Sequence, residues 1–416
     1  MHDIAAAPAD SQNEARWGEL DRLRRTSPMC DAVLDEVRGR HIRSGDHWLV
    51  DFASCNYLGF DCDPEIIAAI EPAVRRWGTH PSWSRLIGSP RLYIDIEERL
   101  AGLLGVEDTL LLPTATLIHA SVIPILAGQG HVFVEASAHR TVYDGCQSAR
   151  GRGATLHRFR ADRPAELDAL LAGIPPGSPV LVCLDGVNSM SGNIPDLPTL
   201  AAICRGRNAT LYVDDTHGFG VVGERGAADA CPYGSRGNSV VRHTGESYDG
   251  IVLVGGFSKA YSSLLAFLAL PTRLKNRLKV DAAPYLYSGP SPTASLATAL
   301  AGLEVNERRG DAIRADLYRK TVRVLDHIRE LDLPTLNTDR LPIVEIPLGN
   351  AEDIDAVALY LWEKGIYVTL AAYPLVPHDR VGFRAQITAL NSDEDIDRLN
   401  NALTGLSHCF ALGSGR

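Results

Sequence analysis

Two apolar segments of the sequence end directly in side chains that can do chemistry. "TLYVDD" ends at Asp214 and Asp215 and runs into "THGFG", which contains His217. "IVLVGG" runs into "FSK", which contains Lys259. Lys259 is one of only five lysines, although lysine and arginine together number 41. A chain that so strongly prefers arginine keeps a lysine at the mouth of an apolar run, so its amine is a candidate catalytic group.

Three more apolar segments have the same form. "TLLLP", "HVFVE" and "VLVCLD" are followed by "TAT" (Thr114, Ala115, Thr116), by "ASAHR" (His139) and by "GVNSMSGN" (Asn188, Ser189). A lysine next to an apolar strand can lose its proton by desolvation and form a Schiff base. A strand-end carboxylate can hold a pyridine nitrogen protonated, a histidine can lie flat on the ring, and hydroxyls and amides at a helix start bind phosphate. Together these groups predict pyridoxal 5′-phosphate (PLP) as the cofactor.

Each of these residues also has a structural interpretation. Lys259 can be a solvated loop lysine, Asp214 a helix cap, and the two histidines satisfied core residues. Loop serines and asparagines usually serve turns, and Thr114 and Thr116 match ordinary helix caps. We expect a structural role for Asp215.

The apolar segments must be the elements that position these groups. Near-continuous apolar strands separated by helical patterns, such as Asp95–Leu104 and Leu197–Arg205, indicate an α/β fold with a mainly parallel sheet covered on both faces. In such sheets, ligands lie beyond the carboxyl ends of the strands. The candidate groups should therefore meet at one edge of one sheet.

The remaining chain suggests further parts. We expect a loose arm over residues 1–14, a helix over Asn13–Arg38, a surface loop over residues 231–249 and a long helix over residues 293–331. Beyond that helix, "LPIVEIPL", a helix over residues 351–364, "IYVTLA", "GFRAQITA" and a last helix with a capping box at Ser392 and Asp395 predict a smaller α+β unit. The predicted domains are an N-terminal arm and helix (1–48), a large cofactor-binding domain (49–292), and a linking helix with a small C-terminal domain (293–416).

Composition narrows the class of protein. The chain has 416 residues, 45% hydrophobic and 22% charged residues, and a net charge of −10. This composition is that of a globular protein, and the dispersed negative charge argues against a nucleic-acid or anionic-membrane partner. No apolar run is long enough to span a bilayer, and the N-terminus does not resemble a secretion signal. Eight scattered cysteines without a C-x-x-C pair favour reduced thiols and a cytoplasmic location.

The run "LYVDDTHGFGVVGERG", followed about 40 residues later by "GGFSKA", resembles the PLP-dependent α-oxoamine synthases. The resemblance extends from "DFASCNYLGF" to "GFRAQITA", most of the chain, with the motifs in the same order. It implies fold type I of the PLP-dependent transferases, with a large sheet domain and a smaller C-terminal domain. The family includes 8-amino-7-oxononanoate synthase and serine palmitoyltransferase.

The resemblance also implies roles for individual residues. Lys259 would carry PLP as a Schiff base and act as acid and base at the substrate α-carbon, and Asp214 would pair with the pyridinium nitrogen. His139 would stack on the ring, while His217 and Ser189 would bond its phenolic oxygen. The phosphate would be bound by Thr114, Ala115, Thr116 and Ser258, and the substrate carboxylate by Arg384 and Asn56. An arginine suits that last role because its planar fork meets a carboxylate in two parallel bonds.

The sequence departs from the family pattern around the cofactor. The lysine is usually followed by spaced glycines, but here the text is "KAYSSLLAF". Gly256 and Gly289 stand where phosphate-binding threonines are common, and "THPSWSR", with Trp83, replaces a glycine-rich segment. We expect these changes to leave fewer side-chain donors for the cofactor phosphate and to reshape the channel for the family's acyl substrate.

The implied activity is that of an acyltransferase. It would condense an amino acid with an acyl thioester of coenzyme A or a carrier protein, with decarboxylation, to give an α-aminoketone. The implied assembly is a homodimer in which residues near Ser288 reach the other subunit's cofactor. Alternatives are another fold-type-I reaction (aminotransferase, aldolase-type lyase or non-decarboxylating acylation) and a non-catalytic regulatory partner. A nucleotide-binding oxidoreductase would need a G-x-G-x-x-G motif directly after its first strand, and no such motif follows the first predicted strand, "TLLLP".

Overall fold

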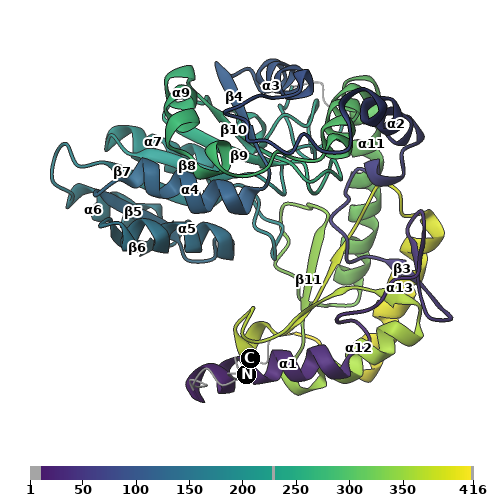
Figure 1. Cartoon of the computed structure of the whole chain (residues 1–416). Helices are drawn as coiled ribbons and strands as arrows, with labels where there is room; N and C mark the ends of the chain where they lie inside the picture. Colours follow the sequence, from purple (N-terminus) through teal and green to yellow (C-terminus); the bar gives the residue numbers. More distant parts are fainter. Residues whose placement is uncertain (1–10, 227–229, 414–416) are drawn as a thin grey trace, which may run out of the picture. The chain divides into compact units, whose positions relative to one another are not determined.

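A computed structural model describes residues 11–226 and 230–413, with side chains from Trp17 onward. The chain forms two compact units. The large unit contains residues 56–189 and 193–318, and the small unit contains the described residues up to Cys55, residues 190–192, and the chain from Arg319. Figure 1 shows the course of the chain through both units.

The large unit is built on a seven-stranded sheet with the order β4-β10-β9-β8-β7-β5-β6. Strands β5 to β9 pair in parallel, whereas β10 runs antiparallel to both β4 and β9. The strands are β4 (Asp108–Leu112), β5 (His131–Glu135), β6 (Thr155–Phe159), β7 (Val180–Asp185), β8 (Thr210–Asp214), β9 (Ile251–Gly256) and β10 (Ala266–Leu270). The mainly parallel sheet predicted from the apolar runs is confirmed, and each strand that we predicted in this unit is present.

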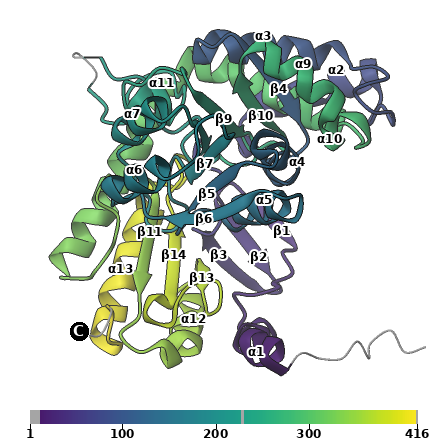
Figure 2. The ribbon, with the colours of Figure 1, turned by 90° about the vertical axis from the view of Figure 1, so that its left-hand side faces the viewer.

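Helices cover both faces of this sheet, which is why its central strands are apolar on both sides. Helices α4 and α5 lie on one face, and α6 and α7 lie on the other (Figure 2). The core on the α4 side joins Ile118 and Val122 of α4 with Leu181 of β7 and Leu268 of β10. The helices of this unit are α2 (Pro64–Trp77), α3 (Arg91–Leu104), α4 (Ala115–Ala127), α5 (Arg140–Gly151), α6 (Pro164–Ala172), α7 (Leu197–Gly206), α8 (Val240–His243), α9 (Thr272–Asp281), α10 (Ala283–Leu286) and the first part of α11 (Thr293–Glu330).

A cluster of buried charges joins α3, β4 and α9. Arg85 donates to Glu97 over 2.8 Å, and Lys275 lies 3.0 Å from Glu97 and 2.7 Å from Asp108. Burial lowers the pKa of Lys275, but the two carboxylates outweigh burial and raise it. Lys275 is therefore a buried lysine whose charge is balanced by two carboxylates, and it is not solvated.

The small unit contains two smaller sheets. One has the order β1-β2-β3-β12 and the other has the order β11-β14-β13. Its last helix starts with the predicted capping box, in which Ser392 and Asp395 each accept from the other's backbone N–H. The elements are α1 (Ser11–Thr26), β1 (Glu36–Arg38), β2 (His41–Ser44), β3 (His47–Asp51), the end of α11, β11 (Ile343–Pro347), α12 (Ile354–Glu363), β12 (Ile366–Tyr367), β13 (Thr369–Ala371), β14 (Gly382–Gln386) and α13 (Asp393–Cys409). Short 3-10 turns occur at Phe60–Cys62, Ala351–Asp353 and His378–Arg380.

Two predictions about local structure were wrong. The helix expected over Asn13–Arg38 ends at Thr26, and the chain continues into strand β1 at Glu36. Valine and leucine suit a strand as well as a helix, so their spacing did not separate the two. The segment 231–249 is not only a surface loop, because it contains the short helix α8 and buries Tyr233 and Val240.

The predicted division of the chain at 48/49 and 292/293 stays a prediction. The chain passes from one compact unit to the other near residues 55 and 318, and helix α11 contributes its first part to the large unit and its end to the small unit. Of the predicted arm over residues 1–14, residues 1–10 lie outside the described part of the chain.

Candidate functional site

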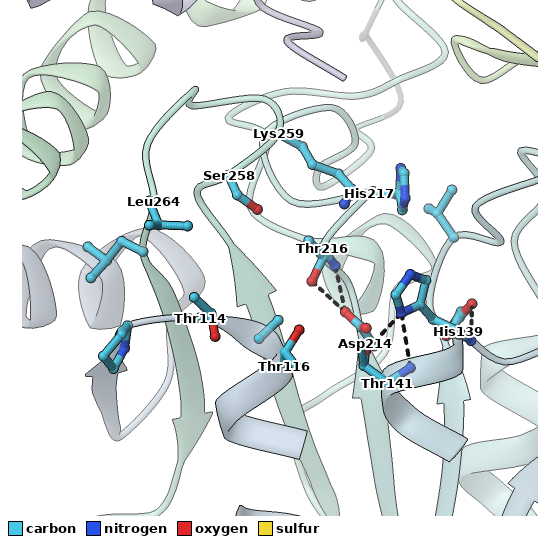
Figure 3. Close-up of a pocket in the computed structure, with 15 residues that line it drawn as sticks. Thr114, Thr116, His139, Thr141, Asp214, Thr216, His217, Ser258, Lys259 and Leu264 are labelled. Atoms are coloured by element: carbon cyan, nitrogen blue, oxygen red, sulfur yellow. Dashed lines mark hydrogen bonds between the residues drawn. The ribbon is translucent and has the colours of Figure 1, made fainter. Parts of the chain in front are cut away.

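A cavity of about 220 Å³ opens at the carboxyl ends of the large sheet. Its walls come from the segments that follow β4, β5, β7, β8 and β9, as expected for a parallel α/β sheet. The residues that line it are Pro113, Thr114, Ala115, Thr116, His139, Thr141, Asp185, Val187, Asp214, Thr216, His217, Ser258, Lys259, Leu264 and Leu265 (Figure 3). All predicted site residues except Ser189, Asn56 and Arg384 are brought together here.

Asp214 is the buried acid of the cavity. It ends β8, and Thr216 donates to its Oδ1 from the backbone N (3.0 Å) and from the side-chain Oγ1 (2.5 Å). Burial raises the pKa of Asp214, but the charge and hydrogen bond of His119 and the hydrogen bonds of Thr216 outweigh it and hold the pKa below its ordinary range. Asp214 is therefore an anion poised to stabilise a cationic group in the cavity.

His119 holds the Asp214 carboxylate through a hydrogen bond from helix α4. It lies in the second turn of α4, is fully buried, and places Nε2 3.0 Å from Asp214 Oδ2 and Nδ1 2.9 Å from the hydroxyl of Tyr212. Both ring nitrogens are therefore engaged, and the chain Tyr212–His119–Asp214 orients the carboxylate. The sequence holds no signal for His119, because an isolated histidine in a helix is usually a core residue.

A second carboxylate, Asp185, lies beside Asp214. The two residues are register partners on the parallel strands β7 and β8. Both oxygens of Asp185 accept from the backbone N of His139, at 3.0 and 3.1 Å. Burial, and to a lesser degree the neighbouring Asp214, raises the pKa of Asp185 well above its ordinary value.

The two predicted histidines are each fixed by a neighbour. His139 caps α5, and its Nδ1 lies 2.8 Å from Thr141 Oγ1, which sets the plane of the ring. His217 follows β8, and its Nδ1 lies 2.8 Å from the hydroxyl of the buried Tyr57. Their rings are thus held in position at the cavity wall.

The start of α4 forms another part of the wall. Thr114 is the N-cap and accepts from the backbone N of Leu117 through its side chain. Helix geometry leaves the N–H groups of Ala115 and Thr116 without intrahelical acceptors, and the helix dipole makes this end positive. Figure 3 shows Thr114, Thr116 and Ser258 on one side of the cavity and Asp214 with His139 on the other. One side therefore suits an anion, and the other suits a cation.

Lys259 lies on a tight loop between β9 and β10. The N–H of Ser262 donates to its carbonyl over 2.9 Å, and Ser262 adopts a φ of 54°, in the left-handed region. Figure 3 shows the lysine side chain extending toward the cavity beside His217. The loop is thus a turn that directs the Lys259 amine inward.

Three predicted residues do not line this cavity. Ser189 follows β7, and Asn56 starts the large unit, where its carbonyl accepts from the N–H of Gly59. Arg384 belongs to strand β14 of the small unit and donates to the sulfur of Met190 over 3.6 Å. Their roles in substrate and cofactor binding stay predictions.

Sequence reasoning missed several residues of the site. Asp185 is the last residue of "VLVCLD", so the rule that selected Asp214 could have selected it too. Thr216 lies inside the recognised motif, and Tyr57 directly follows Asn56. Thr141 carries no signal, since threonine is common in the first turn of a helix.

The donor set matches PLP. The amides and hydroxyls at the start of α4 suit its phosphate, Asp214 suits its ring nitrogen, and Lys259 supplies the amine for its aldehyde. Each of these groups lines the same cavity. The residues present therefore fit the cofactor.

Known proteins agree with this interpretation. The family model for aminotransferase class I and II matches residues 49–403. The 8-amino-7-oxononanoate synthase of Chromohalobacter salexigens is 34% identical over 398 residues, which cover 92% of this chain and 98% of that protein. The chain belongs to the PLP-dependent α-oxoamine synthase family. It is accordingly a PLP-dependent acyltransferase.

Two further relatives cover nearly the same length. The 8-amino-7-oxononanoate synthase of Pseudomonas putida is 31% identical over 404 residues, 96% of each chain. The structure of serine palmitoyltransferase from S. paucimobilis with bound PLP–myriocin aldimine superposes with a TM-score of 0.85 at 23% identity, covering 96% of this chain and 97% of that one. The latter likeness shows the fold, fold type I, which confirms the predicted fold class.

Proposed function

We propose that this α-oxoamine synthase joins an amino acid to an acyl thioester and releases the amino-acid carboxylate as CO2, giving an α-aminoketone. The observation that carries the proposal is the convergence of Lys259, Asp214 and the start of α4 on one cavity. An enzyme of this kind needs an amine, a buried anion and a phosphate site at these relative positions, and the family supplies the reaction type.

Bound PLP supplies an electron sink for negative charge at the substrate α-carbon. Asp214 keeps the proton on the ring nitrogen because its own pKa is low and its carboxylate is held by Thr216 and His119. His139, whose ring is held at the cavity wall by Thr141, would pack against the cofactor ring and exclude water from it. The Nζ of Lys259 takes the proton from the substrate α-carbon and returns a proton after decarboxylation.

The other site residues have binding roles in this proposal. The N–H groups of Ala115 and Thr116, with the hydroxyls of Thr114, Thr116 and Ser258, bind the phosphate. His217 and Ser189 donate to the phenolic oxygen. Arg384 and Asn56 bind the amino-acid carboxylate, as the resemblance implies. The acyl group arrives as a thioester of coenzyme A or of a carrier protein.

The proposed working form is a cytoplasmic homodimer in which residues near Ser288 of one subunit reach the cofactor of the other. The segment around Ser288 supports this role, because Tyr287 beside it is 83% exposed. Among the described residues, no helix is long and apolar enough to cross a membrane. All eight cysteines have free thiols, in keeping with a reducing compartment.

The decisive experiment measures product and cofactor together. The purified protein is mixed with a panel of amino acids and acyl thioesters, while thiol release, CO2 release and the aminoketone are followed. The wild type should show the visible absorbance of lysine-bound PLP and release thiol, CO2 and aminoketone in equal amounts. Lys259→Ala should lose that absorbance and about 10²-fold or more of the rate.

Lys279→Ala is the matched control, since Lys279 lies on helix α9 outside the cavity. It should leave both signals unchanged. A keto acid formed without an acyl thioester would point to transamination instead. Thiol release without CO2 would point to acylation without decarboxylation. A colourless protein that does not bind added PLP would refute the proposal altogether.

A further inference from the structure

Thr216 occupies a position between two functional parts of the cavity. It lies in the segment after β8, is 7% exposed, and donates twice to Asp214 Oδ1. On its other side, its methyl group lies against Gly256, the last residue of β9. One side chain therefore contacts both the acid of the site and the strand end that leads to Lys259.

We propose that Thr216 is a positioning residue for the cofactor: its hydroxyl fixes Asp214 toward the pyridine nitrogen, and its methyl group requires glycine at position 256. This inference rests on the proposed role of Asp214 at the ring nitrogen. It adds a residue that acts through Asp214, and a coupling between two strand ends.

The hydroxyl acts by limiting the acceptor positions of Asp214. A carboxylate has about four acceptor positions. The described structure assigns Thr216 N and Thr216 Oγ1 to Oδ1, and His119 Nε2 to Oδ2. The remaining position is on Oδ2, so Thr216 and His119 together direct a single acceptor toward the ligand. Without the Thr216 hydroxyl, the carboxylate would have a second orientation available.

The methyl group acts by excluding a side chain at 256. A Cβ on Gly256 would lie 2.4 Å from Thr216 Cγ2, and 3.2 and 3.3 Å from its Oγ1 and Cβ. The threonine cannot rotate its methyl group away without moving the hydroxyl from Asp214, because both are attached to the same Cβ. Position 256 therefore has to remain glycine as long as position 216 is threonine.

The test is a set of variants at both positions: Thr216→Ala, Thr216→Ser, Gly256→Ala, and the double variant Thr216→Ser with Gly256→Ala. Three quantities are measured for each, none of which is catalytic activity. The first is the dissociation constant for PLP added to the apoprotein, and the second is the melting temperature of the apoprotein. The third is the absorbance spectrum of the bound cofactor, which responds to the charges and hydrogen bonds around it.

Thr216→Ala should weaken PLP binding about tenfold, the loss expected for one hydrogen bond to a charged group, and should change the spectrum. Thr216→Ser keeps the hydroxyl and should stay within about twofold of the wild type. Gly256→Ala should lower the apoprotein melting temperature markedly, whereas the same change in the Thr216→Ser background should cost much less, because the 2.4 Å contact is to Cγ2.

Two results would overturn the inference. Unchanged PLP affinity and spectrum in Thr216→Ala would show that the hydroxyl does not position Asp214. An equal cost of Gly256→Ala in both backgrounds would show that the two positions are not coupled. Failure of the proposed function is separately visible, since the wild type would then not bind PLP, or Asp214→Ala would bind it as tightly as the wild type.

Discussion

At the scale of single residues, the site depends on keeping one of two adjacent carboxylates ionised. Asp214 and Asp185 are register partners, yet the pKa of Asp214 is lowered while burial and Asp214 raise that of Asp185. The difference comes from the hydrogen-bond donors. Asp214 accepts hydrogen bonds from Thr216 and His119, whereas in the described structure Asp185 accepts only from the backbone N of His139. The pKa values of the two acids are therefore shifted in opposite directions at the same sheet edge.

Removing the imidazole donor should weaken the cofactor site. His119→Leu keeps most of the buried volume but deletes the hydrogen bond to Asp214 Oδ2. Burial then dominates, the pKa of Asp214 rises, and PLP binding should weaken by roughly ten- to a hundredfold. Tyr212→Phe removes only the outer hydroxyl and should cost less than about fivefold. Titration of the apoprotein with PLP checks this order, and equal losses in the two variants would contradict it.

Asp185 should make the apoprotein less stable as the pH rises. Its pKa is raised in the folded state, so the folded protein binds more protons than the unfolded chain between the ordinary value of about 3.9 and the raised value. Stability from this group is complete below the ordinary pKa and is lost as the pH rises through the raised pKa.

The corresponding variant is Asp185→Asn, which removes the titration while retaining an acceptor for His139. Its melting temperature should match the wild type near pH 4 and exceed it increasingly toward neutral pH. Asp249→Asn, at an exposed site, serves as the control and should show no such trend. A difference between Asp185→Asn and wild type that is constant with pH would count against the raised pKa.

At the scale of elements, the loop that carries Lys259 contains backbone strain. Ser262 has a φ of 54°, a conformation that costs a non-glycine residue about 1 kcal/mol or more. Ser262→Gly should therefore raise the free energy of unfolding by up to about 1 kcal/mol, measured by urea denaturation.

Ser263→Gly is the matched comparison in the same loop. Ser263 is buried, has a negative φ, and donates through Oγ to the carbonyl of Ser295 over 2.6 Å. This variant should lose stability by about 1–2 kcal/mol, since it removes a buried hydrogen bond and adds backbone freedom. If both Ser262→Gly and Ser263→Gly stabilise the protein, or if neither does, the left-handed conformation of Ser262 is not the source of the strain.

The buried charges between α3, β4 and α9 permit another comparison of lysines. Lys275→Ala removes the cation beside Asp108 and one of the two cations beside Glu97, which keeps Arg85, and should cost about 3 kcal/mol of unfolding free energy. Lys279→Ala, one turn further along α9, should cost less than about 0.5 kcal/mol. Denaturant titration of both variants decides the matter, and similar values would mean that the cluster does not stabilise the fold.

At the scale of the whole molecule, the proposed shared active site has a direct test. Lys259→Ala and Gly289→Trp should each inactivate a homodimer, the first in its own site and the second across the interface. Random mixing of the two should restore about a quarter of the wild-type activity, because half the dimers are mixed and each holds one intact site. The two variants are unfolded and refolded together, and each is also refolded alone as a control. If both refold alone but the mixture regains no activity, the shared active site is contradicted.

Much of the fold could be predicted because buried parallel strands have an unmistakable pattern. The apolar runs gave β4, β5, β7, β8 and β9, and their ends gave Lys259, Asp214 and His217. The antiparallel strand β10, "AFLAL", was not predicted, because a short apolar run of this kind suits a helix as well as a strand. Strand direction depends on pairing between distant segments, which no local pattern records.

The support of the site was harder to predict than its chemistry. Thr216, Asp185 and His119 act through contacts with Asp214, and each contact joins residues on different elements or across a turn. Side-chain type alone does not reveal such contacts. The small-unit residue Arg384 remains a prediction based on its motif.

The contact between Thr216 and Gly256 also constrains the order in which these two positions can be substituted. Since a Cβ at position 256 would lie 2.4 Å from the threonine methyl group, an ancestor with a side chain at 256 could not accept Thr216 without damage. A change from any side chain at 256 to glycine would therefore have to precede threonine at 216, and threonine at 216 would then prevent its reversal. With both residues present, neither position can change freely without the other.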